Sequence, residues 1–205
     1  MNIAVIGSGN IGSTLAMKWA AKGHTVVAGA RNPAQTKGGE TLKAAGVRVC
    51  GIEEAVSMSD VILLATPAMA AVEVARSLGN TTGKILIDAG NIVMGRGPEG
   101  FTNVSDAILA NTQSKDLVKC FNSTGFNNMQ NPVYQGQAID MFMAGDSVAA
   151  KEAARTLALD AGFAECYDIG GNQHFTLLEQ FAFFWINLAM FKGQGREIAF
   201  KLLKR

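Results

Sequence analysis

Residue types that usually build metal centres and disulfides are scarce in this sequence. The 205 residues include only 2 histidines and 3 cysteines. Cys50, Cys120 and Cys166 each lie in or at the end of an apolar run, and no two form a Cys-x-x-Cys pair. A disulfide framework needs a larger and even set, so we expect three reduced thiols in the core. Zinc-binding and serine-hydrolase motifs are also missing, and the sequence predicts no metal site.

An excess of charge of one sign is also lacking. The formal net charge is +1, so no strong field favours nucleic acid or an anionic membrane as a partner. The N-terminus shows no basic region followed by a cleavage site, and we therefore expect a cytoplasmic protein. Residues 174–191 are rich in Phe, Leu and Trp, but they include Glu179, Gln180 and Asn187. This segment is therefore expected to form a buried or subunit-packed helix rather than a membrane span.

Apolar runs of strand length alternate with helical patterns along the first two thirds of the chain. Such alternation predicts right-handed crossovers and a parallel sheet. The sequence thus predicts an α/β protein with a doubly wound, mostly parallel Rossmann sheet and a small C-terminal helical extension. We expect a dinucleotide-binding domain over residues 1–135 and an extension over 136–205 that packs on it. The expected strands cover residues 2–6, 25–28, 47–50, 61–65, 84–88, 117–121, 138–144 and 164–167.

The first expected strand runs into a Gly7-x-Gly9-x-x-Gly12 turn, and an amphipathic helix follows it. Gly7 permits the tight turn, Gly9 leaves room for a pyrophosphate, and Gly12 lets the helix pack closely on the strand. The free N–H groups at the helix N-terminus then face the phosphates. A glycine turn alone is weak evidence, but this one has the required strand before it and helix after it. The sequence therefore predicts a dinucleotide site.

No acidic residue occurs before Glu40. An NAD site usually has Asp or Glu at the end of the second strand, where it binds the ribose 2′-hydroxyl. Here the segment reads Ala30-Arg31-Asn32, and Arg31 is suited to a 2′-phosphate. Lys37 adds a second positive charge nearby. We therefore predict a preference for NADP(H), with an ordinary exposed arginine as the alternative reading of Arg31.

The later strands end in small residues that form hydrogen bonds and carry no charge at the cleft rim. Such residues suit close approach by a nicotinamide ring and its ribose, although they are also common in ordinary turns. Asp88, which ends the fifth strand, is expected to be structural and to bond the glycine loop after it. The predicted cofactor-binding residues are Gly7, Ser8, Gly9, Asn10, Ile11, Ala30, Arg31, Asn32, Lys37, Thr66, Pro67 and Asn91.

Several segments together resemble the NADPH-dependent reductases of the deazaflavin coenzyme F-420. The segments are VIGSGNIG, VVAGARN, LLATP, NIVMGRGPEGF, KCFNSTGF and NLAMFKGQGREIAFKLL, in this order along nearly the full chain. In that family a Ser-Arg pair holds the 2′-phosphate, and the pair here is Ala30-Arg31. Family members that use the deazaflavin have histidines where this chain has Ala70 and Asn122. The resemblance implies an NADP-dependent oxidoreductase of the F-420-dependent type.

Two functions of different classes fit these patterns. One is an enzyme that transfers hydride between NADPH and a flat acceptor, such as deazaflavin F-420 or a flavin. No catalytic acid or base is assigned, because hydride transfer between two stacked rings needs none from the protein. The alternative is a sensor or scaffold that binds NADP(H) without turnover. The predicted acceptor site, with a turn cap as the alternative for Asn122 and Ser123, consists of Asn122, Ser123, Thr124, Gly193 and Gly195.

The expected C-terminal helix is apolar on nearly every side. One stripe is surrounded by further aromatic residues, and a domain of this size supplies limited cover for such a helix. We therefore predict a homodimer through this helix, with burial inside one chain as the alternative. The stripe consists of Phe175, Leu178, Phe181, Trp185, Leu188 and Ala189, and the surrounding residues are Phe183, Phe184 and Phe191.

Overall fold

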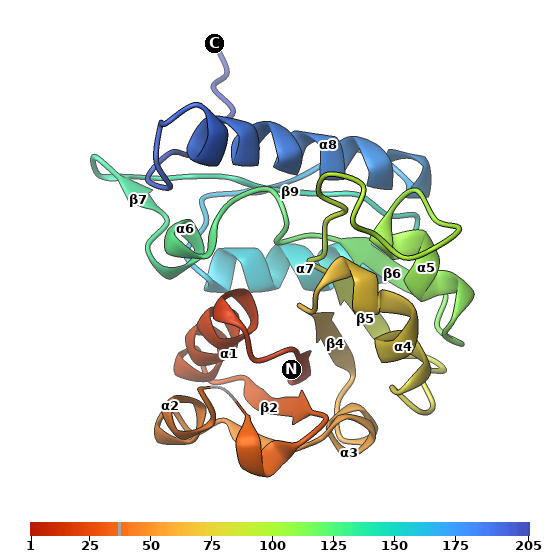
Figure 1. Ribbon diagram of the computed structural model, residues 1–205. Helices are drawn as coiled ribbons and strands as arrows, with labels where there is room; N and C mark the ends of the chain where they lie inside the picture. The colour runs from red at the N-terminus through yellow and green to blue at the C-terminus, as the bar shows by residue number, and fades with distance from the viewer. Residues whose placement is uncertain (37) are drawn as a thin grey trace.

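The computed structural model describes residues 1–36 and 38–205 and contains a six-stranded parallel sheet (Figure 1). Its strand order is β3-β2-β1-β4-β5-β6, with every neighbouring pair parallel. This is the doubly wound order of a dinucleotide-binding sheet, and it confirms the predicted fold class. The strands are β1 (Asn2–Ile6), β2 (Thr25–Ala30), β3 (Arg48–Gly51), β4 (Val61–Leu64), β5 (Ile85–Asp88) and β6 (Asp116–Lys119).

The alternating residues of the strands divide the core into two layers. In β1, Ile3 and Val5 pack with α1, α2 and α7, whereas Ala4 and Ile6 pack with α3, α4 and α5. This division follows from the period of two along a strand, because both faces of a parallel sheet are covered. The helices are α1 (Asn10–Ala21), α2 (Gly39–Ala44) and α7 (Val148–Asp160) on one face, and α3 (Ile52–Ser57), α4 (Ala71–Arg76) and α5 (Val104–Ala110) on the other.

The strand predicted over residues 138–144 is divided in the structure. β7 (Val133–Tyr134) and β8 (Gln137–Ala138) form a hairpin, and β9 (Met141–Met143) pairs in parallel with β10 (Cys166–Asp168). The break falls at Asp140, whose carboxylate accepts hydrogen bonds from Lys201 and from the backbone of Leu202. The segment after β9 also contacts the sheet, since Ala144 and Lys119 form an antiparallel bridge.

Several helices differ from those that the sequence indicates. Pro67 predicts a helix that runs through about Leu78, and in the structure this segment begins as a 3-10 turn at Ala68–Ala70 before α4. Pro33 predicts the start of another helix, and the structure has a 3-10 turn at Pro33–Gln35 before α2. Two short helices, α3 and α6 (Phe126–Gln130), are missing from the prediction because five or six residues carry too little periodicity.

The predicted helical tail is only partly helical. A 3-10 turn at Asn172–His174 leads into α8 (Phe175–Ile186), a π-helical turn covers Asn187–Phe191, and the chain is irregular afterwards. α8 lies across one side of the molecule, beside β9 and the loop that follows β5 (Figure 1). Among the described residues, no helix has both the length and the apolar composition needed to cross a membrane.

The three cysteines are free and buried, as expected. Cys120 and Cys166 come together in the core, with 3.7 Å between their sulfur atoms. Burial raises the pKa of the Cys120 thiol well above its ordinary value, with a further rise from its hydrogen bond to Cys166. The thiol is therefore protonated at neutral pH and behaves as a small core residue.

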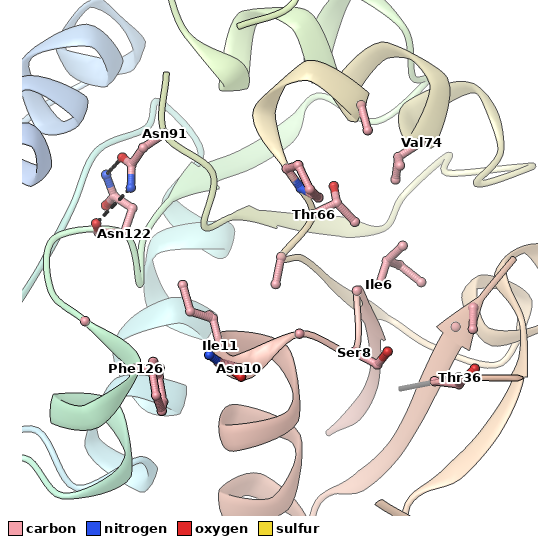
Figure 2. A pocket seen from close by; sticks show the side chains of 18 of the residues that line it. Ile6, Ser8, Asn10, Ile11, Thr36, Thr66, Val74, Asn91, Asn122 and Phe126 are labelled. Carbon is pink, nitrogen blue, oxygen red and sulfur yellow. Dashed lines mark hydrogen bonds between the residues drawn. The ribbon is translucent and has the colours of Figure 1, made fainter. Parts of the chain in front are cut away.

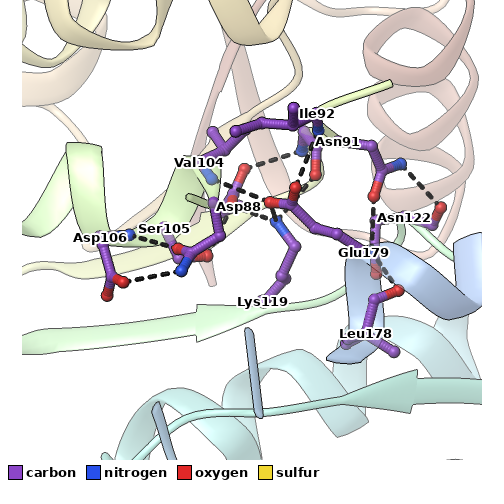
Figure 3. Close-up of polar contacts among 12 residues, drawn as sticks. Asp88, Asn91, Ile92, Val104, Ser105, Asp106, Lys119, Asn122, Leu178 and Glu179 are labelled. Atoms are coloured by element: carbon purple, nitrogen blue, oxygen red, sulfur yellow. Dashed lines mark hydrogen bonds and ion pairs between the residues drawn. The ribbon is translucent and has the colours of Figure 1, made fainter. Parts of the chain in front are cut away.

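A buried ion network joins β5, β6 and α8 (Figure 3). The ammonium of Lys119, which is 0% exposed, lies 2.6 Å from Asp88 Oδ2 and 2.8 Å from Glu179 Oε1. It also donates to the carbonyl of Gly90 at 2.8 Å. The Gly90 N–H donates to Asp88 Oδ1, as the predicted structural role of Asp88 requires. Buried charges are tolerated when their hydrogen-bonding capacity is used in this way.

The carboxylate of Glu179 connects α8 to two separate points of the sheet layer. Its two oxygens accept hydrogen bonds from the backbone N–H groups of Ile92 and Val104, both at 2.8 Å. Ile92 is the fourth residue of the loop after β5, and Val104 begins α5. Glu179 therefore fixes this loop near its start and at its end, and it holds α8 against both.

Replacing Glu179 by alanine should destabilise the protein strongly. The change removes one of the two carboxylates beside the buried Lys119 ammonium and leaves the backbone N–H groups of Ile92 and Val104 without their carboxylate acceptor. Removal of one partner of a buried pair typically costs about 3–5 kcal/mol. Urea denaturation should show a loss of this size for Glu179→Ala, whereas Glu152→Ala, on an exposed turn of α7, should change the free energy of unfolding by less than about 0.5 kcal/mol. Equal stability of the two variants would contradict the role assigned to the network.

Candidate functional site

The three glycines of the first turn have different surroundings. Gly7 has φ +109°, and a side chain there would collide with the carbonyl of Ala65. A Cβ at Gly12 would overlap the carbonyl oxygen of Gly7, so helix α1 can pack on β1 only with glycine at this position. A Cβ at Gly9 would meet nothing within 4 Å. Gly7 and Gly12 are thus required by the backbone conformation and by close packing, whereas Gly9 faces open space at the start of α1.

A cleft of about 880 Å³ opens in front of this turn. Figure 2 shows side chains from the first turn of α1, the end of β4, Asn91 and Asn122 arranged around one opening. Its size falls in the range of cofactor sites. It lies beyond the carboxyl ends of the strands, where doubly wound sheets bind ligands. The cofactor-binding residues predicted from the sequence that line it are Gly7, Ser8, Gly9, Asn10, Ile11, Ala30, Arg31, Asn32, Thr66, Pro67 and Asn91.

One end of the cleft is polar and carries Arg31 directly after β2. The Asn32 amide donates to Gln35 at 3.0 Å, and the Thr36 hydroxyl donates to the Asn32 carbonyl at 3.0 Å. Gln35 and Thr36 also line the cleft, and the sequence reasoning missed both. Their position in the turn after β2 is a signal that could have found them. The predicted contribution of Lys37 lies outside the described residues.

The surroundings of Arg31 correct one element of the sequence analysis. No acidic residue follows β2, yet Glu73 of α4 places its Oε1 3.2 Å from Arg31 Nη1. The two side chains are 77% and 67% exposed. Residues 42 positions apart cannot be paired from spacing alone, because the meeting depends on how the tertiary fold brings α4 near the end of β2. Arg31 therefore has a carboxylate beside it, which the sequence pattern did not indicate.

Two asparagines join the middle of the cleft. Asn91 donates its amide to the Asn122 carbonyl at 3.0 Å, and the Asn122 amide donates back to Asn91 Oδ1 at 2.8 Å. The Asn122 amide also donates to the carbonyl of Leu178 in α8 at 3.3 Å. Asn122 was predicted to bond an acceptor directly, but its N–H groups already have partners. Its Oδ1 is buried and has no hydrogen-bond partner among the described residues.

The other end of the cleft is apolar and comes mostly from the C-terminal part of the chain. Its walls are Phe126, Trp185, Ile186 and Met190, and Arg196 adds a guanidinium. The Trp185 indole N–H donates to the Ile198 carbonyl at 2.7 Å, which fixes the irregular tail beside α8. These residues were not predicted as site residues, and only the closeness of Arg196 to the predicted Gly193 and Gly195 pointed to this segment.

Three residues predicted for the acceptor site do not line the cleft. The Ser123 side chain is buried and its hydroxyl lies 3.4 Å from the sulfur of Met141, so it faces the core. Gly193 and Gly195 lie in an exposed turn with positive φ and lead the chain to Arg196. Asn122 and Thr124 do line the cleft. Two of the five predicted acceptor residues thus line the cleft, beside aromatic and aliphatic side chains that the sequence analysis did not name.

Comparison with known proteins agrees with this geometry. Residues 2–92 match the sequence profile of the family described as NADP oxidoreductase, coenzyme F420-dependent. A proposed F420-dependent NADP reductase from Arthrobacter sp. FB24 is 25% identical, with a TM-score of 0.86 over 100% of both chains. A hypothetical protein from Sinorhizobium meliloti is 21% identical, with a TM-score of 0.71 over 100% of this chain and 96% of that one.

A more distant structure extends the comparison of the fold. An imine reductase from Myxococcus stipitatus, solved in complex with NADP+, is 18% identical with a TM-score of 0.67. The match covers 94% of this chain and 62% of that enzyme. The fold is therefore shared with a larger NADP-binding reductase. Together with the glycine turn and the cleft in front of it, the profile match identifies residues 2–92 as a segment similar to the coenzyme F420-dependent NADP oxidoreductases.

Proposed function

We propose that this chain is an oxidoreductase that binds NADP(H) in the cleft and transfers hydride between NADPH and a flat acceptor. The observation that carries the proposal is the continuity of one cleft from Arg31, past the glycine turn, to the apolar walls around Trp185. A dinucleotide is an extended ligand with charged and aromatic parts, and this cleft changes from polar to apolar along its length. The family match and the NADP+ complex of the Myxococcus enzyme support the same ligand.

Different residues of the chain would bind different parts of the dinucleotide. Arg31 would bind the 2′-phosphate, with Asn32 and Thr36 as uncharged neighbours. The backbone at Gly9 and Asn10 would bind the pyrophosphate, because helix α1 starts there without an acidic residue in its first turn. Thr66, Pro67 and Asn91 would lie beside the nicotinamide. When bound, the nicotinamide supplies the hydride chemistry, and the protein supplies orientation and a dry wall.

The acceptor would occupy the apolar end of the cleft. Phe126, Trp185, Ile186 and Met190 offer the surface on which a planar ring packs, and Arg196 offers a charge at its edge. A deazaflavin F-420 or a flavin has such a ring. The role of Asn122 is revised accordingly, because its amide holds Asn91 and α8 in place rather than facing the acceptor.

A panel of acceptors tests the proposed reaction. NADPH oxidation is followed at the nicotinamide absorbance with deazaflavin, flavins, quinones and ferric chelates. Turnover with at least one flat acceptor supports an enzyme. Tight NADPH binding without turnover on any of them favours the sensor alternative, and failure to bind NADPH rejects both functions.

Arg31→Ala should remove most of the preference for NADPH over NADH. A charge-assisted hydrogen bond contributes about 1.5–3 kcal/mol, which corresponds to one to two powers of ten in affinity. Fluorescence titration of both reduced cofactors measures the change, and NADH affinity should stay within a few fold. An unchanged preference for NADPH over NADH in the Arg31→Ala variant would show that the 2′-phosphate does not bind at Arg31.

Met190→Glu should impair acceptor reduction while it leaves NADPH binding nearly intact. The side chain lies in the apolar wall and is about half exposed, so the variant should fold. A carboxylate there opposes the packing of a flat ring, and we expect at least a tenfold loss of kcat/KM for the acceptor. Leu177→Glu, at an equally exposed position of the same proposed dimer surface that does not line the cleft, is the control. Equal activities of the two variants would show that the acceptor does not pack against Met190.

We also propose that the protein forms a homodimer through α8 and the turn after it. The structure buries one side of this segment but leaves five apolar side chains between 38% and 56% exposed. Clustered exposure of this kind marks an interaction surface. These side chains are Leu177, Phe183, Phe184, Met190 and Phe191.

Light scattering at micromolar concentration should therefore give twice the mass of the chain. Leu177→Glu places a charge in the exposed side of α8 and should shift the population to monomer. Circular dichroism verifies that the variant keeps its helices. A monomeric unmutated protein would contradict the proposed assembly.

A further inference from the structure

The ion pair between Arg31 and Glu73 lies at the part of the cleft where the 2′-phosphate would distinguish NADP(H) from NAD(H). Arg31 lines the cleft, and so do Ala70 and Val74, which lie three residues before and one residue after Glu73. Val74 is labelled in Figure 2. The 3.2 Å distance between Arg31 Nη1 and Glu73 Oε1 means that a group bound by one side chain is adjacent to the other. Both side chains are largely exposed, and such pairs are weak enough to open when a ligand arrives.

The carboxylate of Glu73 has opposite consequences for the two dinucleotides. A 2′-phosphate is close to doubly charged at neutral pH, so Glu73 repels it and competes with it for Arg31. The 2′-hydroxyl of NAD(H) is a hydrogen-bond donor, and a carboxylate is the usual acceptor for it in this fold. That acceptor normally follows the second strand, where this chain has Ala30 and Arg31 instead.

We infer that Glu73 is a specificity-determining residue that opposes Arg31. It supplies from α4 the carboxylate that the end of β2 lacks. Cofactor choice is therefore set by the Arg31–Glu73 pair rather than by Arg31 alone, and Glu73 lowers the preference for NADP(H) while it keeps NAD(H) usable. This inference rests on the proposed binding of a nicotinamide dinucleotide in the cleft.

The test compares Glu73→Gln with Glu40→Gln. Both substitutions remove one negative charge from an exposed ion pair, but Glu40 pairs with Lys43 at 2.9 Å on α2, and Lys43 does not line the cleft, whereas Arg31, the partner of Glu73, does. Any general effect of net charge is therefore common to the two variants. Dissociation constants for NADPH and NADH are measured by fluorescence titration at low and high salt.

Glu73→Gln should bind NADPH at least threefold more tightly and NADH less tightly, so that the ratio of the two constants changes by fivefold or more. The change should shrink at high salt, because it is electrostatic. Glu40→Gln should leave the ratio within twofold of the unmutated protein. If Glu73→Gln leaves the ratio unchanged while NADPH still binds, the inference about Glu73 is wrong and the proposed function stands. If the unmutated protein binds neither cofactor, the proposed function fails and the inference fails with it.

Discussion

The arrangement of the cleft depends on the buried network of Lys119, Asp88 and Glu179. Lys119 binds the carbonyl of Gly90, and Glu179 binds the N–H of Ile92, so the backbone is held on both sides of Asn91. The side chain of Asn91 is held in turn by Asn122. Four contacts therefore fix one amide at the cleft rim. A charge network of this type is costly when incomplete, and it specifies a single arrangement because every member needs the others.

The same network connects the C-terminal extension to the sheet. Glu179 and Leu178 belong to α8, and they bond the loop after β5 and the side chain of Asn122. α8 also contributes Trp185 and Ile186 to the apolar end of the cleft. The polar end therefore comes from the sheet and its first turns, whereas the apolar end comes from α8 and the tail. A ligand that spans both ends would contact both parts of the chain.

The sequence was sufficient to predict the fold, and the residues it indicates after the first strands line the cleft. The glycine turn and Arg31 are local features, because a strand, a turn and a helix follow each other within a few residues. The partners of Lys119 could not be deduced in the same way, since they lie 31 and 60 positions away. A lone lysine in the apolar run Leu117–Phe121 was the available signal, because a buried charge requires a partner. Glu73 beside Arg31, and Trp185 beside Gly125, likewise depend on packing rather than on spacing.

A crystal structure of the protein with NADP+ tests the central claim most directly. The proposed binding mode predicts the 2′-phosphate at Arg31, the pyrophosphate at the N–H groups of Gly9 and Asn10, and the nicotinamide beside Thr66 and Asn91. It also predicts that the face of the ring towards Trp185 and Met190 stays open for an acceptor. Density for the dinucleotide outside this cleft, or with the adenine and nicotinamide ends exchanged, would contradict it.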